Sequence, residues 1–203
     1  MEAGSINTEN SSLQKIPVRI VQTQDMHGNK KVGVMLDIQY YQSRPNIDPD
    51  AKVKEFKELY FGTIEQANKI LRTTKSKGTS RNSKYYWKLS ELLRHFNEQT
   101  QNEFEISNYA AALQRDFGLT DSYVGLILNF GKYFKEDEVL DEIPFNVYLE
   151  LTRKKGKLER LGIFQQEKSK LLMMATKEGK IPNGMAYRKA LAELIQSHRD
   201  NRN

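Results

Sequence analysis

The chain begins its folded part with two short hydrophobic runs that alternate with polar residues. Residues 16–24 read IPVRIVQTQ and residues 30–42 read KKVGVMLDIQYYQ, both rich in β-branched or aromatic side chains. Such runs are typical of strands. The residues between them, DMHGN at 25–29, include a glycine and an asparagine that tolerate positive φ. The pattern therefore predicts a β-hairpin.

A third strand and one helix are expected to complete this first unit. Residues 43–52 (SRPNIDPDAK) hold two prolines and read as a loop. In 55–62 (EFKELYFG) the apolar residues Phe56, Leu59 and Phe61 alternate with polar ones, although imperfectly, and this pattern suggests a third strand. In 63–72 (TIEQANKILR), Thr63 is the expected N-cap, with Gln66 three residues later. One apolar helical face follows, made of Ile64, Ala67, Ile70 and Leu71.

The remaining hydrophobic residues recur at helical spacing. Residues 73–83 have no large apolar side chain and read as a basic linker. After it, apolar stripes indicate helices near 84–97, 109–117, 120–133, 145–155, 166–178 and 184–199. The predicted fold class is α+β: a small antiparallel three-stranded sheet with one helix (15–72), then an all-α domain (84–203). The polar residues 1–14 are expected to be a disordered tail.

The overall charge favours a polyanionic partner. The chain carries 32 Lys and Arg against 26 Asp and Glu, a formal net charge of +6. It has no cysteine, which excludes disulfides and thiolate chemistry. The N-terminal residues lack the apolar core of a signal peptide, and no run reaches the ~18 apolar residues of a membrane span. We expect a soluble cytoplasmic protein associated with the nucleoid, with no membrane partner.

Residues that could carry catalysis are scattered. The three histidines, His27, His95 and His198, share no metal-ligand spacing, and no phosphate-binding glycine loop or nucleophile elbow is present. The acidic run EDEVLDE at 136–142 lacks the ligand alternation of a calcium loop and reads as a solvated helix start. The sequence therefore predicts no enzyme activity, cofactor, metal or small-molecule substrate.

The stretch DFGLTDSYVGLILNF at 116–130 joins two apolar helices through a glycine. In a helix-turn-helix the turn needs a residue that tolerates left-handed backbone, which favours Gly118. Val124 and Ile127 then follow at the spacing that packs into the angle between the helices, opposite Leu113 and Phe117. Thr120 can cap the second helix and Asp121 suits its first turn. A corner of an all-helical core would show the same pattern.

At these residues the chain resembles the helix-turn-helix of the ParB/KorB family of partition proteins. The turn GLTDSYV, the apolar helix after it and the acidic KEDEVLDEIP carry the resemblance, over roughly residues 105–150. It implies a DNA-binding protein that acts as a transcriptional regulator or a plasmid partition factor, expected to be a homodimer. Gln114 departs from the small residue usual there, and no arginine-rich nucleotide-binding box is present, so a nucleotide-dependent clamp is not implied.

The expected DNA contacts come from two places. The second helix would present Thr120, Asp121, Ser122, Tyr123 and Asn129 to the groove, with Lys132 at its end. Asn129 could pair with adenine, and Ser122 could touch bases or phosphates. Between residues 69 and 94 eight basic residues face one acid, which suits a phosphate-binding arm. The residues chosen from this basic arm are Arg81, Lys84 and Lys88.

Three weaker patterns leave other functions open. LYFGTIEQANKIL (59–71) is similar to the last strand and helix of the sheet domains of ethylene-response factors and of recombinase arm-binding regions. That resemblance implies a sheet that enters the major groove. Leu126, Tyr133 and Phe134 could form an apolar surface for a protein partner. Tyr85, Tyr86 and Trp87 could stack on RNA bases or begin the core of the helical domain.

Overall fold

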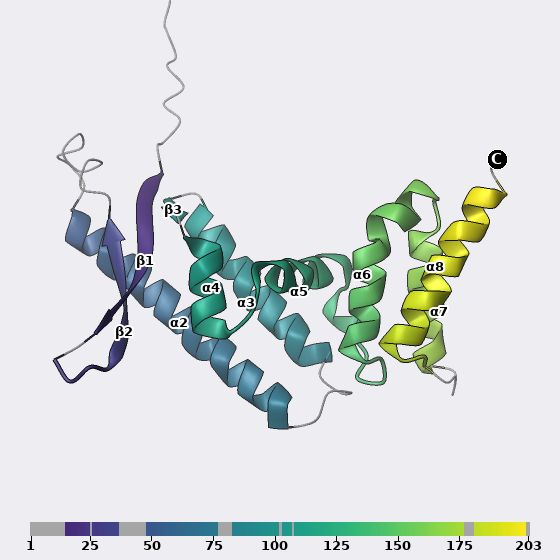
Figure 1. The fold of residues 1–203 in the computed structure, drawn as a ribbon, viewed down its shortest axis with the longest axis horizontal. Coiled ribbons are helices and arrows are strands. Elements are labelled where there is room, and N and C mark those ends of the chain that lie inside the picture. Colours follow the sequence, from purple (N-terminus) through teal and green to yellow (C-terminus); the bar gives the residue numbers. More distant parts are fainter. Residues whose placement is uncertain are drawn as a thin grey trace, which may run out of the picture. The chain divides into compact units, whose positions relative to one another are not determined.

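The computed structural model describes residues 15–24, 26–36, 48–76, 83–101, 103–106, 108–176 and 181–201 (Figure 1). The contacts within it define two compact units. Unit 1 comprises residues 1–58 and 97–109, and unit 2 comprises residues 59–96 and 110–203. This grouping differs from the expected domains 15–72 and 84–203, because each unit is assembled from two separate segments. The expected tail 1–14 and residues 77–82 of the expected linker lie outside the described residues.

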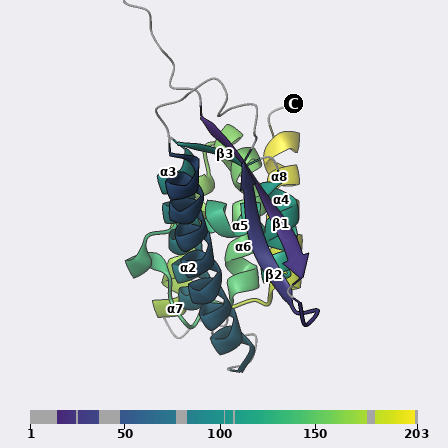
Figure 2. The ribbon, with the colours of Figure 1, turned by 90° about the vertical axis from the view of Figure 1, so that its left-hand side faces the viewer.

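The predicted hairpin is present in unit 1. Strands β1 (Ile16–Gln24) and β2 (Lys30–Leu36) pair antiparallel, from Val18 opposite Leu36 to Gln24 opposite Lys30 (Figure 2). Gly28 lies in the turn with φ +77°, the conformation that a glycine adopts at little cost. The side chains of Val18 and Ile20 are buried, whereas Arg19 between them is exposed. The hairpin therefore buries one face, as its alternating sequence requires.

The third strand is not the one expected, and it makes the sheet mixed. Strand β3 (Phe104–Ile106) pairs parallel with β1, so the strand order is β2-β1-β3. Asn108 extends this pairing, because its side chain accepts from Ile20 N at 2.9 Å and donates to Ile20 O at 2.5 Å. The sequence predicted a purely antiparallel sheet and an all-helical chain after residue 84. Both predictions were wrong, because three strand residues are too few to show periodicity.

The predicted loop at 43–52 and strand at 55–62 are replaced from Pro49 onward by a long helix, α2 (Pro49–Ser76). Asp48 Oδ1 accepts from Asp50 N at 3.0 Å and from Ala51 N at 3.2 Å, so Asp48 caps a helix with proline at its first position. The buried positions recur at helical spacing and are Phe56, Tyr60, Thr63, Ala67 and Leu71.

Two further expectations about this segment fail with the strand. Phe61, taken as a strand residue, is 39% exposed on the outer side of the helix. Thr63 is not an N-cap, because it lies inside the helix and its hydroxyl donates to Leu59 O at 2.8 Å. The last strand that the resemblance of 59–71 to ethylene-response factors and recombinase arm-binding regions implies is thus absent, because residues 59–62 are helical.

Unit 2 is built from helices. Besides its part of α2 it contains part of α3 (Ser83–Gln101), then α4 (Tyr109–Phe117), α5 (Asp121–Tyr133), α6 (Phe145–Arg160), α7 (Phe164–Thr176) and α8 (Gly184–Asp200). A short 3-10 helix, Glu136–Glu138, joins α5 to the segment before α6. In the described part of the chain, no helix is both long and apolar enough to cross a membrane.

Helix α6 lies at the centre of unit 2, with consecutive buried residues from Val147 to Thr152. An aromatic cluster packs on it: the ring of Phe130 is 5.2 Å from that of Phe145 and 5.1 Å from that of Tyr148. The buried Tyr148 hydroxyl donates to Glu138 O and accepts from Leu140 N, both at 2.9 Å. These bonds hold the connection between α5 and α6 against the core.

Helices α3 and α5 are in close contact where Gly131 of α5 meets the side chain of Ser90 of α3. A Cβ atom built on Gly131 would lie 2.1 Å from Ser90 Oγ, which is far inside van der Waals contact. Ser90 is fully buried, and its hydroxyl has no hydrogen-bond partner in the described part of the chain. The serine and the glycine are therefore paired by size, and this contact fixes which face of α5 points inward.

One buried carboxylate ties α6 to α8. Glu150 is 3% exposed and receives two hydrogen bonds from Arg188, Nε to Oε2 at 2.9 Å and Nη2 to Oε1 at 2.6 Å. Arg153 Nη1 donates to the same carboxylate at 2.5 Å. Burial acts to raise the pKa of Glu150, but the two guanidinium groups outweigh it and hold this pKa below its usual range.

We expect Glu150→Gln to lower the melting temperature at neutral pH and to have a smaller effect in acid. A carboxyl with a lowered folded-state pKa stabilises the fold above its unfolded pKa and loses this contribution as pH falls through the folded pKa. Thermal melts from neutral pH into the acid range show whether the melting temperatures of the wild-type protein and Glu150→Gln converge as the pH falls. The control is Glu159→Gln, which breaks an exposed pair with Lys155 and should change little. A Glu150→Gln deficit that persists in acid would contradict the assignment.

Candidate nucleic-acid interface

The turn between α4 and α5 has the left-handed residue that the sequence predicts (Figure 1). Gly118 has φ +67°, and its amide donates to Gln114 O at 3.0 Å, closing helix α4. Only two residues, Leu119 and Thr120, separate it from α5. The two helices are thus joined by a three-residue turn, as in a helix-turn-helix.

The start of α5 is capped as expected. Thr120 has extended backbone angles, and its hydroxyl accepts from Tyr123 N at 3.4 Å. The Thr120 and Ser122 hydroxyl oxygens lie 3.2 Å apart on the exposed end of the helix. Asp121 is exposed in the first turn, where its charge suits the helix dipole. This end therefore presents two hydroxyls and one carboxylate to the outside.

The inner face of α5 is apolar and fully packed. Val124 is 3% exposed, and both Ile127 and Phe130 are 0% exposed. Leu113 on α4 is buried too, as the helix-turn-helix pattern predicts. The side chain of Phe117, expected beside it, lies outside the described residues. The two helices thus share one core, and the polar side of α5 faces away from it.

We name the opposite face of α5 the outer stripe, made of Ser122, Gly125, Asn129 and Lys132. The spacing of three, four and three residues places all four on one side of the helix. Ser122, Asn129 and Lys132 are exposed, and nothing lies within 4 Å of a Cβ built on Gly125. There is room for a side chain at position 125. Because glycine has none, another molecule can come close to the helix backbone there.

Tyr123 does not belong to the outer stripe, although the sequence placed it among the DNA contacts. It is half-buried and interacts with Tyr86 of α3. Burial raises the pKa of its hydroxyl, and the interaction with Tyr86 adds to this effect. Its position points to packing between α3 and α5.

Three of the aromatic residues considered for other partners, Tyr86, Trp87 and Phe134, make packing contacts within unit 2. The Tyr86 ring stacks on Phe145 at 3.8 Å between centroids, and Trp87 Nε1 donates to Phe134 O at 2.8 Å. Phe134 is 1% exposed and cannot offer an apolar surface to a protein. Leu126 and Tyr133 are half-buried. The alternative in which these aromatics begin the helical core is therefore confirmed for Tyr86 and Trp87.

Two residues of the basic arm, Lys84 and Lys88, do not lie on the side of the outer stripe. Lys88 and Lys84 lie on the exposed side of α3, and Lys84 Nζ is 3.8 Å from Asp141. Lys88 lies two residues from Ser90, which places it about 160° around the helix from the contact with α5. Arg81 lies outside the described residues. The outer stripe and these lysines thus occupy different sides of the crossing between α3 and α5.

Helix α6 supplies a cation that the sequence did not single out. Lys155 Nζ lies 4.4 Å from the centre of the Tyr133 ring, and the Tyr133 hydroxyl donates to Asn129 Oδ1 at 3.4 Å. The same Nζ pairs with Glu159 at 2.6 Å, so an aromatic contact and an ion pair together hold Lys155 close to the outer stripe. The available signal was the basic run RKKGKLER at 153–160, which also fits a helix C-terminus.

The acidic run after α5 has a structural use. Lys168 Nζ donates to Tyr133 O at 2.8 Å and to Glu138 Oε2 at 2.7 Å. Glu138 also accepts from Lys135 N at 2.8 Å. Burial acts to raise the pKa of Glu138, but these partners hold it below its usual range. Within the described ranges, no three acidic or histidine side chains gather in a way that could hold a metal ion.

Comparisons of the chain with protein-family models, with curated proteins and with solved structures find no match. The resemblance to ParB/KorB proteins therefore rests on the sequence of roughly residues 105–150 alone.

We expect Gly118→Ala to destabilise the protein by ~1 kcal/mol, because alanine resists φ near +67°. Thermal or denaturant unfolding measures the change. The matched control is Gly156→Ala, in the interior of α6 with open space around the new methyl group. There alanine should stabilise by about 0.5–1 kcal/mol. If Gly118→Ala left the free energy of unfolding unchanged, or raised it as Gly156→Ala is expected to do, the turn would tolerate a side chain.

Proposed function

We propose that the protein binds duplex DNA with helix α5 in the major groove, as a regulator or partition factor. The observation that carries this proposal is the turn at Gly118 with φ +67°, which joins α4 to a helix whose inner face is packed and whose outer stripe is polar. This is the arrangement in which a recognition helix is held by its partner helix. The resemblance to ParB/KorB proteins supports the same function.

Each residue of the outer stripe has a chemical role in this proposal. Asn129 offers the amide donor and acceptor that match adenine, and Ser122 can donate to a base edge or phosphate. Gly125 lets the helix backbone come close to the groove. Lys132 is exposed and makes no ion pair with any residue that the structure describes, so its charge is available for a phosphate.

Two further groups would set the position of the helix on the duplex. Thr120 lies at the helix N-terminus, where hydroxyls and backbone amides contact phosphates. Lys155 lies near Asn129 through Tyr133 and could neutralise a second phosphate by exchanging its ion pair with Glu159 for that contact. Asp121 opposes binding because its carboxylate would lie near the DNA backbone. The interface is therefore suited to reading bases more than to strong non-specific attraction.

We expect Ser122→Ala with Asn129→Ala to weaken binding to a preferred duplex by about 10-fold or more while leaving binding to random DNA nearly unchanged. Selection from random duplexes supplies the preferred site, and fluorescence anisotropy measures both affinities. The matched control is Gln165→Ala with Ser169→Ala, which removes an exposed amide and a hydroxyl from α7. Enrichment of inverted repeats would support the expected homodimer. Failure to enrich any sequence would overturn the proposal.

Salt dependence separates the outer stripe from the basic arm. Lys132→Ala should reduce the slope of log affinity against log salt by ~0.9 if Lys132 contacts one phosphate. Lys84→Ala with Lys88→Ala tests the other side of the α3–α5 crossing in the same assay. An unchanged slope for Lys132→Ala and a reduced slope for the α3 pair would assign DNA to the basic arm. In that case α5 would be a scaffold helix.

A further inference from the structure

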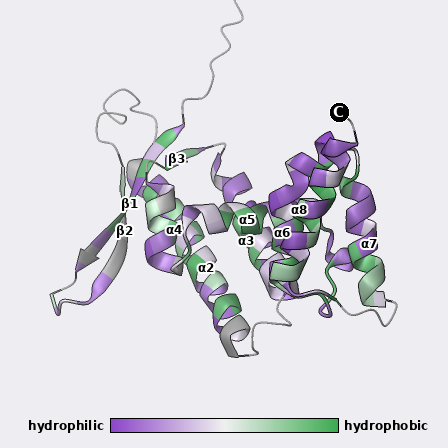
Figure 3. Cartoon of the chain, turned by 45° about the vertical axis from the view of Figure 1, so that its right-hand side comes forward, coloured by the Kyte–Doolittle hydropathy of each residue, from purple (hydrophilic) through white to green (hydrophobic). Residues whose placement is uncertain are grey.

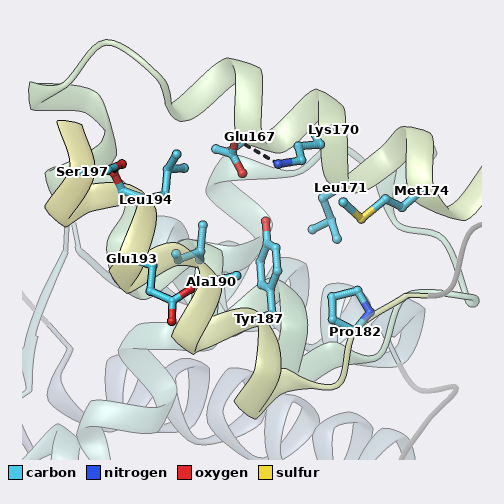
Figure 4. A pocket seen from close by; sticks show the side chains of 11 residues that line it. Glu167, Lys170, Leu171, Met174, Pro182, Tyr187, Ala190, Glu193, Leu194 and Ser197 are labelled. Carbon is cyan, nitrogen blue, oxygen red and sulfur yellow. Dashed lines mark hydrogen bonds and ion pairs between the residues drawn. The ribbon is translucent and has the colours of Figure 1, made fainter. Parts of the chain in front are cut away.

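A pocket lies between α7 and α8, and neither the fold nor the proposed DNA interface uses it (Figure 4). Its volume is about 430 Å³, within the range of cavities that hold small molecules. Figure 3 shows hydrophobic residues interspersed among hydrophilic ones along both helices. The apolar side chains that line the pocket are Leu171, Met174, Pro182, Ala190, Leu191 and Leu194.

The pocket contains a buried hydroxyl without a partner. Tyr187 is 4% exposed, and its hydroxyl makes no hydrogen bond to any residue that the structure describes. Figure 4 shows this hydroxyl pointing across the pocket toward Glu167 and Lys170 of α7. A buried hydroxyl that is unpaired has lost its hydrogen bonds to water without replacing them, so its retention calls for a partner. A ligand in the pocket would supply one.

A buried carboxylate lies in the same pocket. Glu167 is 7% exposed, and its nearest cation among the described residues is Lys170, at 3.8 Å between Nζ and Oε1. Glu193 also lines the pocket, but its side chain is 68% exposed and pairs with Lys189 at 3.8 Å. Lys170 is exposed too, with 59% of its side chain accessible, so the buried charge in the pocket lining is the Glu167 carboxylate. Charge complementarity therefore favours a positively charged occupant.

We propose that this pocket binds a small organic cation, namely an alkylammonium group with an aliphatic chain. The ammonium would donate hydrogen bonds to the Glu167 carboxylate and to the Tyr187 hydroxyl oxygen. Its aliphatic chain would pack on Leu171, Leu191 and Leu194. This site lies apart from the outer stripe of α5, and the proposal stands independently of DNA binding.

Hexylamine, hexanol and hexanoate test the proposal, because they share an aliphatic chain and differ in charge. The chain has six methionines, so ¹³C-methyl labelling gives a small set of NMR signals. Met174 lines the pocket, and its neighbour Met173 is 55% exposed, which makes it an internal control. We expect hexylamine to shift the Met174 signal saturably, at a concentration at least tenfold lower than hexanol. Hexanoate should bind most weakly.

Two variants assign the polar contacts. Glu167→Gln should weaken hexylamine binding about tenfold because it removes a charge-assisted hydrogen bond. Tyr187→Phe should weaken it several-fold without lowering the melting temperature, since it removes a hydroxyl that the free protein leaves unpaired. Glu159→Gln, which also removes a carboxylate paired with a lysine on its own helix, should leave binding unchanged.

The outcomes that overturn the proposal are distinct. Equal affinity for hexylamine and hexanol would show that charge plays no part, and the pocket would be only an apolar gap. A Met174 signal that hexylamine does not move would show that the pocket takes no such ligand. Unchanged binding in Tyr187→Phe together with Glu167→Gln would place the amine elsewhere.

Discussion

The close contact between α3 and α5 determines which residues of α5 face the core of unit 2 and which face outward. Gly131 lies against Ser90 with no room for even one added carbon atom. Since a helix is a rigid body with fixed angular spacing, this one contact sets the rotation of α5 about its own axis. Val124, Ile127 and Phe130 are then forced inward, and the outer stripe is forced outward. A larger residue at position 131 would push the helices apart and disturb every residue on both faces.

Several cations of unit 2 are engaged in ion pairs or hydrogen bonds with carboxylates of the same unit. Arg115 pairs with Asp116 at 2.6 Å, and the Tyr60 hydroxyl donates to the same carboxylate. Arg153 and Arg188 share Glu150, and Lys168 binds Glu138. These charged groups thus stabilise the fold. A cation near α5 that makes no such pair with the described residues, such as Lys132, then determines how strongly a polyanion is attracted.

The sequence was most informative where a local rule acts alone. The hairpin at 16–36, the cap at Thr120 and the left-handed Gly118 follow from backbone preferences of a few neighbouring residues, and all are present. The mixed α+β composition was also predicted. Helix α2 was misread because Asp48 and Pro49 fit a loop as well as a helix start, and the strand at 55–62 relied on Phe61, which is exposed.

What the sequence missed depends on contacts between distant residues. Strand β3 exists only because β1 offers it a free edge, and nothing in three residues reveals that partner. Lys155 comes near Asn129 only through packing of α6 against α5. The same holds for Lys88, which has the right charge for a DNA contact but lies on the side of α3 away from α5.

The parallel pairing of β1 with β3 has a consequence for how unit 1 forms. Ile20 and Asn108 are 88 residues apart, and the whole of α2 and α3 lies between them in the chain. Closing so long a loop costs entropy before any hydrogen bond is gained, so this pairing should come late in folding. On the ribosome, the β1 edge would stay open until residue 108 has emerged. During that interval the hairpin carries an unpaired edge, which is the surface through which partly folded chains associate.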